Sequence, residues 1–228
     1  MTGRPGDGGG VTPEDVLPTY RRVAGAFARG RAGDLHERPA LDALLRLAPG
    51  PRVLDLGCGT GVPVARYLAD HGARITGVDG AGPMLRLFRR NLPGHAALAR
   101  DMRGLRLGTR FDAIIAWNSL FHLSATAQRP MFATVARHAA PGAAFLFTSG
   151  PVAGRRIGHA AGGAAVFHES LDPAEYRHLL RAAGFEVVCF RPEDPEVREH
   201  SWWLARRRPD ASTPRARGPA FAIGDPAP

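Results

Sequence analysis

Short apolar runs alternate with amphipathic stretches over most of the chain. The runs are rich in Val, Ile, Leu, Ala and Phe, which is typical of buried strands, and the stretches between them repeat apolar residues at helical spacing. Strands are predicted at residues 53–56, 74–79, 96–100, 111–117, 143–148, 185–190 and 200–205. Helices are predicted at residues 13–30, 37–48, 62–70, 84–91, 126–139 and 173–183. A strand followed by a helix, repeated along the chain, indicates an α/β fold.

The order of these elements predicts a doubly wound sheet. Strand and helix alternate until the last two strands, which follow each other without a helix. We therefore expect a seven-stranded sheet that is mostly parallel, with one late antiparallel strand and helices on both faces. A single domain should occupy residues 12–208, between Gly- and Pro-rich tails at 1–11 and 209–228 that are expected to be disordered. Within the domain we expect a helical lid at 12–50 and a long Gly- and Ala-rich loop at 150–170.

One turn stands out because glycines occupy alternate positions in it. The apolar run Val53–Leu56 leads directly into Gly57, Gly59 and Gly61, and a helical pattern follows at once. Glycines leave the backbone open to a bound molecule, and a strand, a glycine turn and a helix in this order form a cradle for a nucleotide. Ligands of doubly wound sheets bind at the carboxyl ends of the strands. At those ends the chain also places Asp79, Asp101, Trp117 and Asn118.

The residues alone leave the kind of nucleotide open. Asp79 follows Gly61 by 18 residues, about the distance at which an acid accepts hydrogen bonds from ribose hydroxyls. Turns that bind NAD read G-x-G-x-x-G, whereas this turn reads G-x-G-x-G and is preceded by Asp55. An NAD-dependent oxidoreductase is therefore the least favoured class of function.

Several motifs, in register, resemble those of a known family. The segment Asp55–Gly61 resembles the first motif of the class I S-adenosylmethionine (SAM)-dependent methyltransferases. The other matching segments are Val78-Asp79, Arg100-Asp101-Met102, Phe111–Ile115 with Leu120–Leu123, and Ala140–Ala143. The resemblance covers about residues 20–207 and implies a Rossmann-like fold with SAM as the cofactor.

The resemblance also implies roles for individual residues. The cradle formed by Asp55, Gly57, Gly59 and Gly61 would line the methionine part of SAM. The ribose would be held by Asp79, beside Gly80. Asp101 would accept a hydrogen bond from the adenine amino group, with Met102 against the ring. Trp117 and Asn118 would lie beside the sulfonium.

The N-terminal helices and the 150–170 loop are expected to cover the site. In small-molecule members of the family, segments such as 12–50 lie over the cofactor, and we expect Arg38 from this segment to pair with the carboxylate of SAM. The 150–170 loop stands where such enzymes build a wall around the substrate, and its small residues suggest a mobile lid.

Histidines supply the candidate bases. Methyl transfer is a displacement on an activated donor, so alignment does much of the work, and a base helps only an acceptor that still carries its proton. His122 follows the fourth predicted strand, and His159 and His168 lie in the 150–170 loop. Glu169 could orient His168 as a base. Packing or surface roles for all three histidines stay open on sequence grounds, and Tyr176 is expected to be a core or lid aromatic.

Composition limits the partners, the metal sites and the location that we expect for this protein. All 30 basic residues are arginine, so the formal net charge of +9 reflects a compositional bias more than a nucleic-acid surface. The two cysteines, Cys58 and Cys189, are too few for a disulfide framework or a zinc site, and we expect no metal. The sequence has no apolar run of the roughly 18 residues that cross a bilayer and no secretory signal, which favours a cytoplasmic protein without membrane contact.

We therefore predict a SAM-dependent methyltransferase that methylates an O, N or S atom of a small molecule, as a monomer or homodimer. The main alternative is a SAM-using enzyme that performs an intramolecular displacement within SAM. A SAM-binding protein without catalysis and an RNA methyltransferase are weaker alternatives. A closed pocket beside the methyl group would favour the intramolecular reaction, and a continuous arginine face leading to the pocket would favour RNA.

Overall fold

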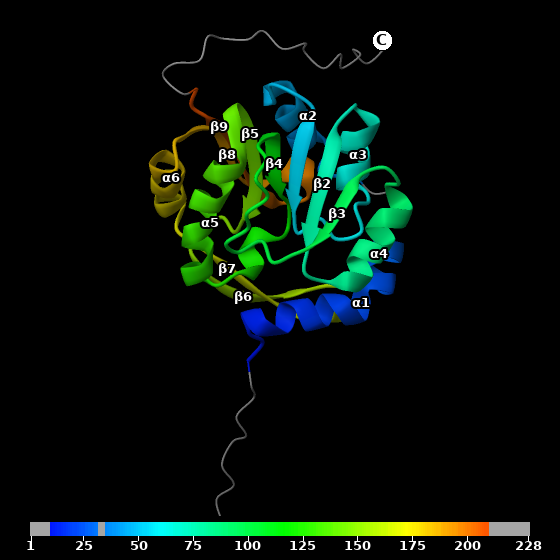
Figure 1. The fold of residues 1–228 in the computed structure, drawn as a ribbon. Coiled ribbons are helices and arrows are strands. Elements are labelled where there is room, and N and C mark those ends of the chain that lie inside the picture. Colours follow the sequence, from blue (N-terminus) through cyan, green and yellow to red (C-terminus); the bar gives the residue numbers. More distant parts are fainter. Residues whose placement is uncertain (1–9, 32–34, 210–228) are drawn as a thin grey trace, which may run out of the picture.

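The fold is that of a computed structural model, which describes residues 10–31 and 35–209 (Figure 1). Most of both predicted tails, residues 1–9 and 210–228, lies outside the described residues. Within the described ranges, none of the helices combines the length and the apolar character that crossing a membrane requires.

A mostly parallel sheet forms the centre of the molecule. Its seven strands lie in the order β3-β2-β1-β4-β5-β9-β8, and only β9 runs antiparallel to its neighbours. Their bounds are Arg52–Leu56 (β1), Arg74–Asp79 (β2), Ala96–Ala99 (β3), Phe111–Ala116 (β4), Ala139–Ser149 (β5), Phe185–Asp194 (β8) and His200–Arg207 (β9). The predicted fold class is confirmed. β1 and β4 are central and buried on both faces, as their almost wholly apolar sequences require.

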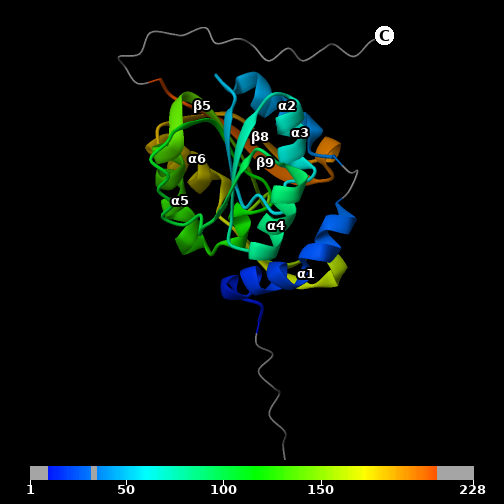
Figure 2. The same cartoon turned by 45° about the vertical axis from the view of Figure 1, so that its right-hand side comes forward.

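Helices cover both faces of this sheet (Figures 1 and 2). Their bounds are Val16–Gly30 (α1), Arg38–Leu47 (α2), Val64–Asp70 (α3), Gly82–Asn91 (α4), Ala125–His138 (α5) and Pro173–Ala182 (α6). Short 3-10 turns lie at Pro13–Asp15 (η1), Leu120–His122 (η2), Ala161–Gly163 (η3) and Pro195–Val197 (η4). Successive strand residues point to opposite faces, so Leu54 packs with α5 and α6 while its neighbour Val53 packs with α2, α3 and α4.

The segment 150–170 is not the loop that the sequence predicts. It forms an antiparallel pair of strands, β6 (Gly154–His159) and β7 (Ala165–Ser170), which is separate from the main sheet. The turn between them is closed by a hydrogen bond from the Ala160 N–H to the Ala164 carbonyl, 2.8 Å. The prediction fails because glycine and alanine at several positions remove the alternation of apolar and polar side chains that indicates a strand. One of these positions, Gly158, must be glycine because the His168 ring occupies the space where its side chain would stand.

The hairpin and α1 together cover the carboxyl edge of the parallel strands. Both lie below the sheet in Figure 1, and in Figure 2 α1 remains beside α4 at that end. Leu17, Tyr20 and Phe27 of α1 pack with Ala81 and Met84 at the end of β2 and the start of α4. This arrangement encloses the edge where the sequence predicts a ligand.

Candidate functional site

A cavity of about 890 Å³ lies between the carboxyl edge of the sheet, α1 and the β6–β7 hairpin. Its volume falls in the range of about 300–1,000 Å³ that ligand pockets occupy. The glycine turn lines one part of it, and Tyr20, His122 and His168 line another. One cavity therefore joins the predicted cradle to the predicted bases.

The glycine turn is fixed to the end of β2. The N–H groups of Gly57 and Cys58 both donate to the carbonyl of Val78, at 2.8 and 3.1 Å. Gly57 has a φ of 77°, and a Cβ there would lie 2.4 Å from the Cβ of Ser119. At Gly59, with a φ of 53°, a Cβ would meet only Phe27, at 3.9 Å. Gly57 is therefore needed for packing, and Gly59 leaves the turn open toward the cavity.

Asp79 closes the cradle from the next strand. Its carboxylate accepts hydrogen bonds from the N–H groups of Gly59 (2.9 Å) and Ala81 (2.7 Å). Burial raises the pKa of Asp79, and the backbone hydrogen bonds oppose that rise. The adjacent Gly80 makes room for α1, because a Cβ there would lie 2.8 Å from a methyl of Leu17.

Asp55 is a second buried acid in the cradle. It is 4% exposed and lines the cavity. Burial, and secondarily the nearby charge of Asp79, raise the pKa of Asp55 to about 7. A cation entering the cavity would relieve both effects, so this end of the site suits a positively charged ligand.

Asp101 and Met102 line the cavity after β3. Burial would raise the pKa of Asp101, but hydrogen bonds from Arg103 outweigh it and lower that pKa. Arg103 Nε lies 2.9 Å and its Nη2 2.6 Å from one carboxylate oxygen. Asp101 is therefore an ionised acceptor at the cavity wall.

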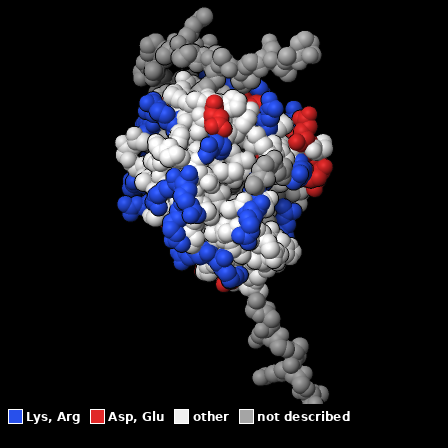
Figure 3. All heavy atoms as spheres, turned by 90° about the vertical axis from the view of Figure 1, so that its right-hand side faces the viewer, with Lys and Arg blue, Asp and Glu red and all other residues white. Residues whose placement is uncertain are grey.

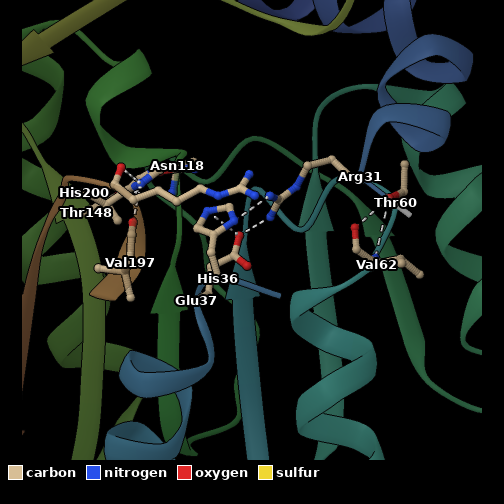
Figure 4. A network of polar contacts seen from close by, with 10 residues as sticks. Arg31, His36, Glu37, Thr60, Val62, Asn118, Thr148, Val197 and His200 are labelled. Atoms are coloured by element: carbon tan, nitrogen blue, oxygen red, sulfur yellow. Dashed lines mark hydrogen bonds and ion pairs between the residues drawn. The ribbon is translucent and has the colours of Figure 1, made fainter. Parts of the chain in front are cut away.

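After β4, Asn118 presents a buried acceptor that has no hydrogen-bond partner among the described residues (Figure 4). His200 Nδ1 lies 2.8 Å from the Val197 carbonyl, which can only accept, so Nδ1 is the donor there. The Asn118 Nδ2 group can only donate, so His200 Nε2 accepts from it, 3.2 Å away. This contact orients the amide and leaves Asn118 Oδ1 without a hydrogen bond. Trp117 stacks on His200 with ring centroids 5.9 Å apart, and its buried Nε1 also lacks a partner.

Of the two arginines Arg31 and Arg38, Arg31 lines the cavity and Arg38 does not. Arg31 lines the cavity from the end of α1 and pairs with the buried Glu37 (Figure 4). The Arg38 side chain is 66% exposed, lies 3.7 Å from Asp42 and is absent from the cavity wall. In this structure the Arg38 side chain therefore does not reach the cavity, where the sequence predicts a contact with the cofactor carboxylate.

Tyr20 and His122 form a hydrogen-bonded pair on the other side of the cavity. His122 Nδ1 lies 2.9 Å from the carbonyl of Phe167, which can only accept, so Nδ1 carries the proton. Tyr20 OH, 2.9 Å from Nε2, is therefore the donor of their hydrogen bond. Burial lowers the pKa of His122 to about 4 and raises that of Tyr20 to about 12, so both groups are neutral near pH 7.

His168 faces this pair, but Glu169 does not orient it. The His168 ring centroid lies 4.9 Å from that of His122, and its Nδ1 is buried without a partner. Glu169 points to the opposite face of β7, where it accepts from the N–H of Ala125 at 2.6 Å and pairs with Arg155 at 2.8 Å. Neighbouring residues of a strand cannot share one face, so the predicted base and orienter are separated.

Sequence reasoning missed two pairings, that of Tyr20 with His122 and that of His200 with Asn118. The first pair is separated by 102 residues and the second by 82, and no local pattern links such positions.

Comparison with known proteins agrees with this geometry. The profile of a family described as a methyltransferase domain matches residues 53–142. The chain is 31% identical to an O-methyltransferase of Penicillium expansum, covering 78% of this chain and 74% of the relative. It is 34% identical to a dTDP-3-amino-3,6-dideoxy-alpha-D-glucopyranose N,N-dimethyltransferase of Streptomyces fradiae, over 44% of this chain and 40% of the relative.

Solved structures share the whole fold. The CcbJ methyltransferase from Streptomyces caelestis superposes with a TM-score of 0.67 at 23% identity, over 87% of this chain and 98% of its own. An amino pentose methyltransferase from Micromonospora echinaspora, solved with bound SAM, gives 0.64 at 23% identity, over 81% and 96%.

The fraction of a relative's length that this chain matches differs among the curated relatives. The chain spans about half the length of several, for example 46% of a cypemycin N-terminal methyltransferase of a Streptomyces species at 35% identity. The Penicillium relative is matched over 74% of its length at 31% identity. The chain therefore belongs to the class I SAM-dependent methyltransferases.

Proposed function

We propose that this protein transfers a methyl group from SAM to an O, N or S atom of a small molecule. The observation that carries the proposal is the single cavity that joins the glycine cradle to the Tyr20–His122 pair. Relatives named as O- and N-methyltransferases, including one acting on malonyl-[acyl-carrier protein], support this reaction class. The space beyond the cradle favours methyl transfer over a displacement within SAM, which would need no room for a second molecule.

The donor would lie along the cradle. Bound SAM supplies a methyl group that is already activated for displacement. Asp79 would accept from the ribose hydroxyls, Asp101 from the adenine amino group, and Met102 would pack on the ring. Arg31 would hold the carboxylate, and Asp55 with the unpartnered Asn118 Oδ1 would face the cationic methionine end. Asn118 Oδ1 lacks a hydrogen-bond donor, and burial disfavours the charged form of Asp55. Both groups fit a ligand that brings hydrogen-bond donors and positive charge.

The Tyr20–His122 pair would align the acceptor. Because Tyr20 donates its own hydrogen to His122 Nε2, its oxygen lone pairs remain free to accept from an acceptor O–H or N–H. A proton released there could pass to Tyr20 while the Tyr20 proton moves to His122. With a pKa of about 4, His122 is a weak base. We therefore expect the pair to act mainly by aligning the acceptor and less by removing the acceptor's proton before methyl transfer.

The covering elements complete the proposed site. Residues 12–50 would act as the lid over the cofactor, and β6–β7 would form the wall of the acceptor site. We expect a monomer or homodimer in the cytoplasm, acting on a small molecule and on neither nucleic acid nor membrane. Among the residues that the structure describes, Cys58 and Cys189 are both free thiols, which suits a reducing compartment.

Calorimetry with SAM and with S-adenosylhomocysteine tests the cofactor. Mass spectrometry on incubations with hydroxyl, amine and thiol acceptors then tests the reaction, because methyl transfer yields S-adenosylhomocysteine and a product one methyl heavier in equal amounts. SAM-derived products without a methylated acceptor would support the intramolecular alternative instead. A protein that binds NAD but not SAM would overturn the proposal.

A further inference from the structure

Two adjacent arginines of β6 have different surroundings. Arg155 stands opposite Glu169 in the β6–β7 register, pairs with it at 2.8 Å, and lies over the Phe167 ring with its Cζ 5.8 Å from the centroid. Arg156 stands opposite His168 and lines the cavity. The Arg156 side chain makes no hydrogen bond or ion pair with any residue in the described ranges.

The groups near Arg156 on the acceptor side do not neutralise it. His168 is kept neutral by burial, by His122 and by the positive charge of Arg156 itself, which together lower its pKa to about 3. Tyr20 and His122 are neutral for the reasons given above. Two acids of the cavity, the buried Asp55 and the half-buried Asp79, stand at the cradle, where the donor would lie.

The other charged residues of the wall do not pair with Arg156 either. The glutamates that line the cavity are Glu14, Glu193 and Glu199, and none forms an ion pair with it. Of the other arginines of the wall, Arg31 and Arg103 are held by Glu37 and Asp101. Arg198 has an interaction of its own, and Arg100 follows β3 next to Asp101, where the donor would lie. The wall opposite His168 thus holds an exposed guanidinium, that of Arg156, without a counter-charge paired to it among the described residues.

We propose that Arg156 binds an anionic group of the methyl acceptor, so that the substrate is a small carboxylic acid or phosphate ester that also carries the atom to be methylated. The inference rests on the proposed function. The acceptor would place its nucleophile at Tyr20 and its anion at Arg156. A guanidinium presents paired N–H donors that match two oxygens of a carboxylate or phosphate.

Binding to the S-adenosylhomocysteine complex tests this without turnover. The probes are 4-hydroxybenzoate, 4-aminobenzoate and glucose 6-phosphate, each compared by ligand-observed NMR titration with its uncharged counterpart: the two methyl esters and glucose. The wild type should bind at least one anion about 10-fold or more tightly than its counterpart, the size of one charge-assisted hydrogen-bonded contact. The tighter of the carboxylate and phosphate arms identifies the anion.

Arg156→Gln and Arg155→Gln provide the matched comparison, because each removes one positive charge from the same strand. Arg156→Gln should lose the preference for the anion, Arg155→Gln should keep it, and Arg156→Lys should keep part of it. SAM affinity by calorimetry should be unchanged in Arg156→Gln, which also reports that the variant is folded.

The outcomes separate the two proposals. A wild type that binds SAM but prefers no anion over its neutral counterpart contradicts the inference and leaves methyl transfer standing. Equal loss of the preference in Arg155→Gln and Arg156→Gln also contradicts it, because a general charge effect would then explain the preference. A wild type that does not bind SAM overturns the proposed function itself.

Discussion

At the scale of single residues, Tyr20 is the most informative side chain of the acceptor site. Its hydrogen is committed to His122, so its oxygen can only accept from what lies in the cavity. Tyr20→Phe should therefore lower kcat about 10- to 100-fold, in the range of a lost aligning or proton-transfer group. SAM affinity should stay unchanged, as measured by calorimetry.

The control for that variant is Tyr67→Phe. Tyr67 also donates its hydroxyl hydrogen, to Asp42, but it is not part of the cavity wall. Both variants lose one hydrogen bond, so both should lose about 1 kcal/mol of folding free energy. Equal kcat values for the two variants would remove Tyr20 from the mechanism.

Arg31 and Arg38 make a second residue-scale comparison. Arg31→Ala should weaken SAM binding at least about 10-fold, because the carboxylate of SAM would lose a charge-assisted partner. Arg38→Ala should bind SAM like the wild type, because its side chain faces solvent beside Asp42. The measurement is calorimetric Kd for both variants, and the reverse order would restore Arg38 as the cofactor residue.

Asp55 predicts a pH effect whose sign follows from its pKa. The pKa is raised from 3.8 to about 7 by burial and by Asp79, so the folded state holds a proton that the unfolded chain releases. Asp55 therefore contributes a loss of stability as pH rises from about 4 to 7. Asp55→Asn should flatten this part of the profile and unfold at higher temperature than the wild type at pH 8, with little difference at pH 4.

Asp79 limits how flat that profile becomes. Its pKa is also raised, so it contributes to the slope in the same direction and remains in the variant. Scanning calorimetry without ligand measures both proteins. A slope unchanged by Asp55→Asn would mean that Asp55 is ionised in the free protein.

At the scale of elements, β6–β7 depends on a contact between Gly158 and His168. A Cβ at residue 158 would lie 2.2 Å from His168 Cε1, so Gly158→Ala must displace the ring or the strand. We expect a loss of about 1–3 kcal/mol in folding free energy and a lower kcat/KM. Urea unfolding and steady-state kinetics measure the two effects.

Gly25→Ala in α1 is the matched substitution. Gly25 is exposed, and a Cβ there would only reach ordinary contact with Arg29 at 3.7 Å. Alanine should stabilise the helix by about 0.5–1 kcal/mol. If Gly158→Ala were as harmless, the hairpin would be mobile enough to absorb the overlap.

The elements also show how far sequence reasoning reaches. Apolar runs such as Phe111–Ala116 predict the sheet because a strand that is buried on both faces consists almost entirely of apolar residues. The three glycines Gly57, Gly59 and Gly61 predict the cradle because all three adopt positive φ, which favours glycine. The hairpin was missed because its pattern depends on a cross-strand contact of His168. The Asn118–His200 pair was missed because it forms only once β9 is in place.

At the scale of the whole molecule, the positive charge is carried by the surface. Figure 3 shows arginine side chains gathered on the face to the right in Figure 1, and α4 contributes the exposed Arg86, Arg89 and Arg90. With a net charge of +9, such a field raises the encounter rate with anions and falls with added salt. This property acts in the same direction as the proposed contact with Arg156.

The helix α1 touches both halves of the cavity, through Leu17 against Gly80 at the cradle and Tyr20 against His122 on the acceptor side. Because α1 contacts both parts of the cavity, we expect the donor and the acceptor to bind in a fixed order. The donor would enter first and fix α1, the acceptor would follow, and S-adenosylhomocysteine would leave last. Steady-state kinetics should then show S-adenosylhomocysteine inhibiting competitively against SAM and noncompetitively against the acceptor, whereas random entry would contradict a mechanical role for this helix.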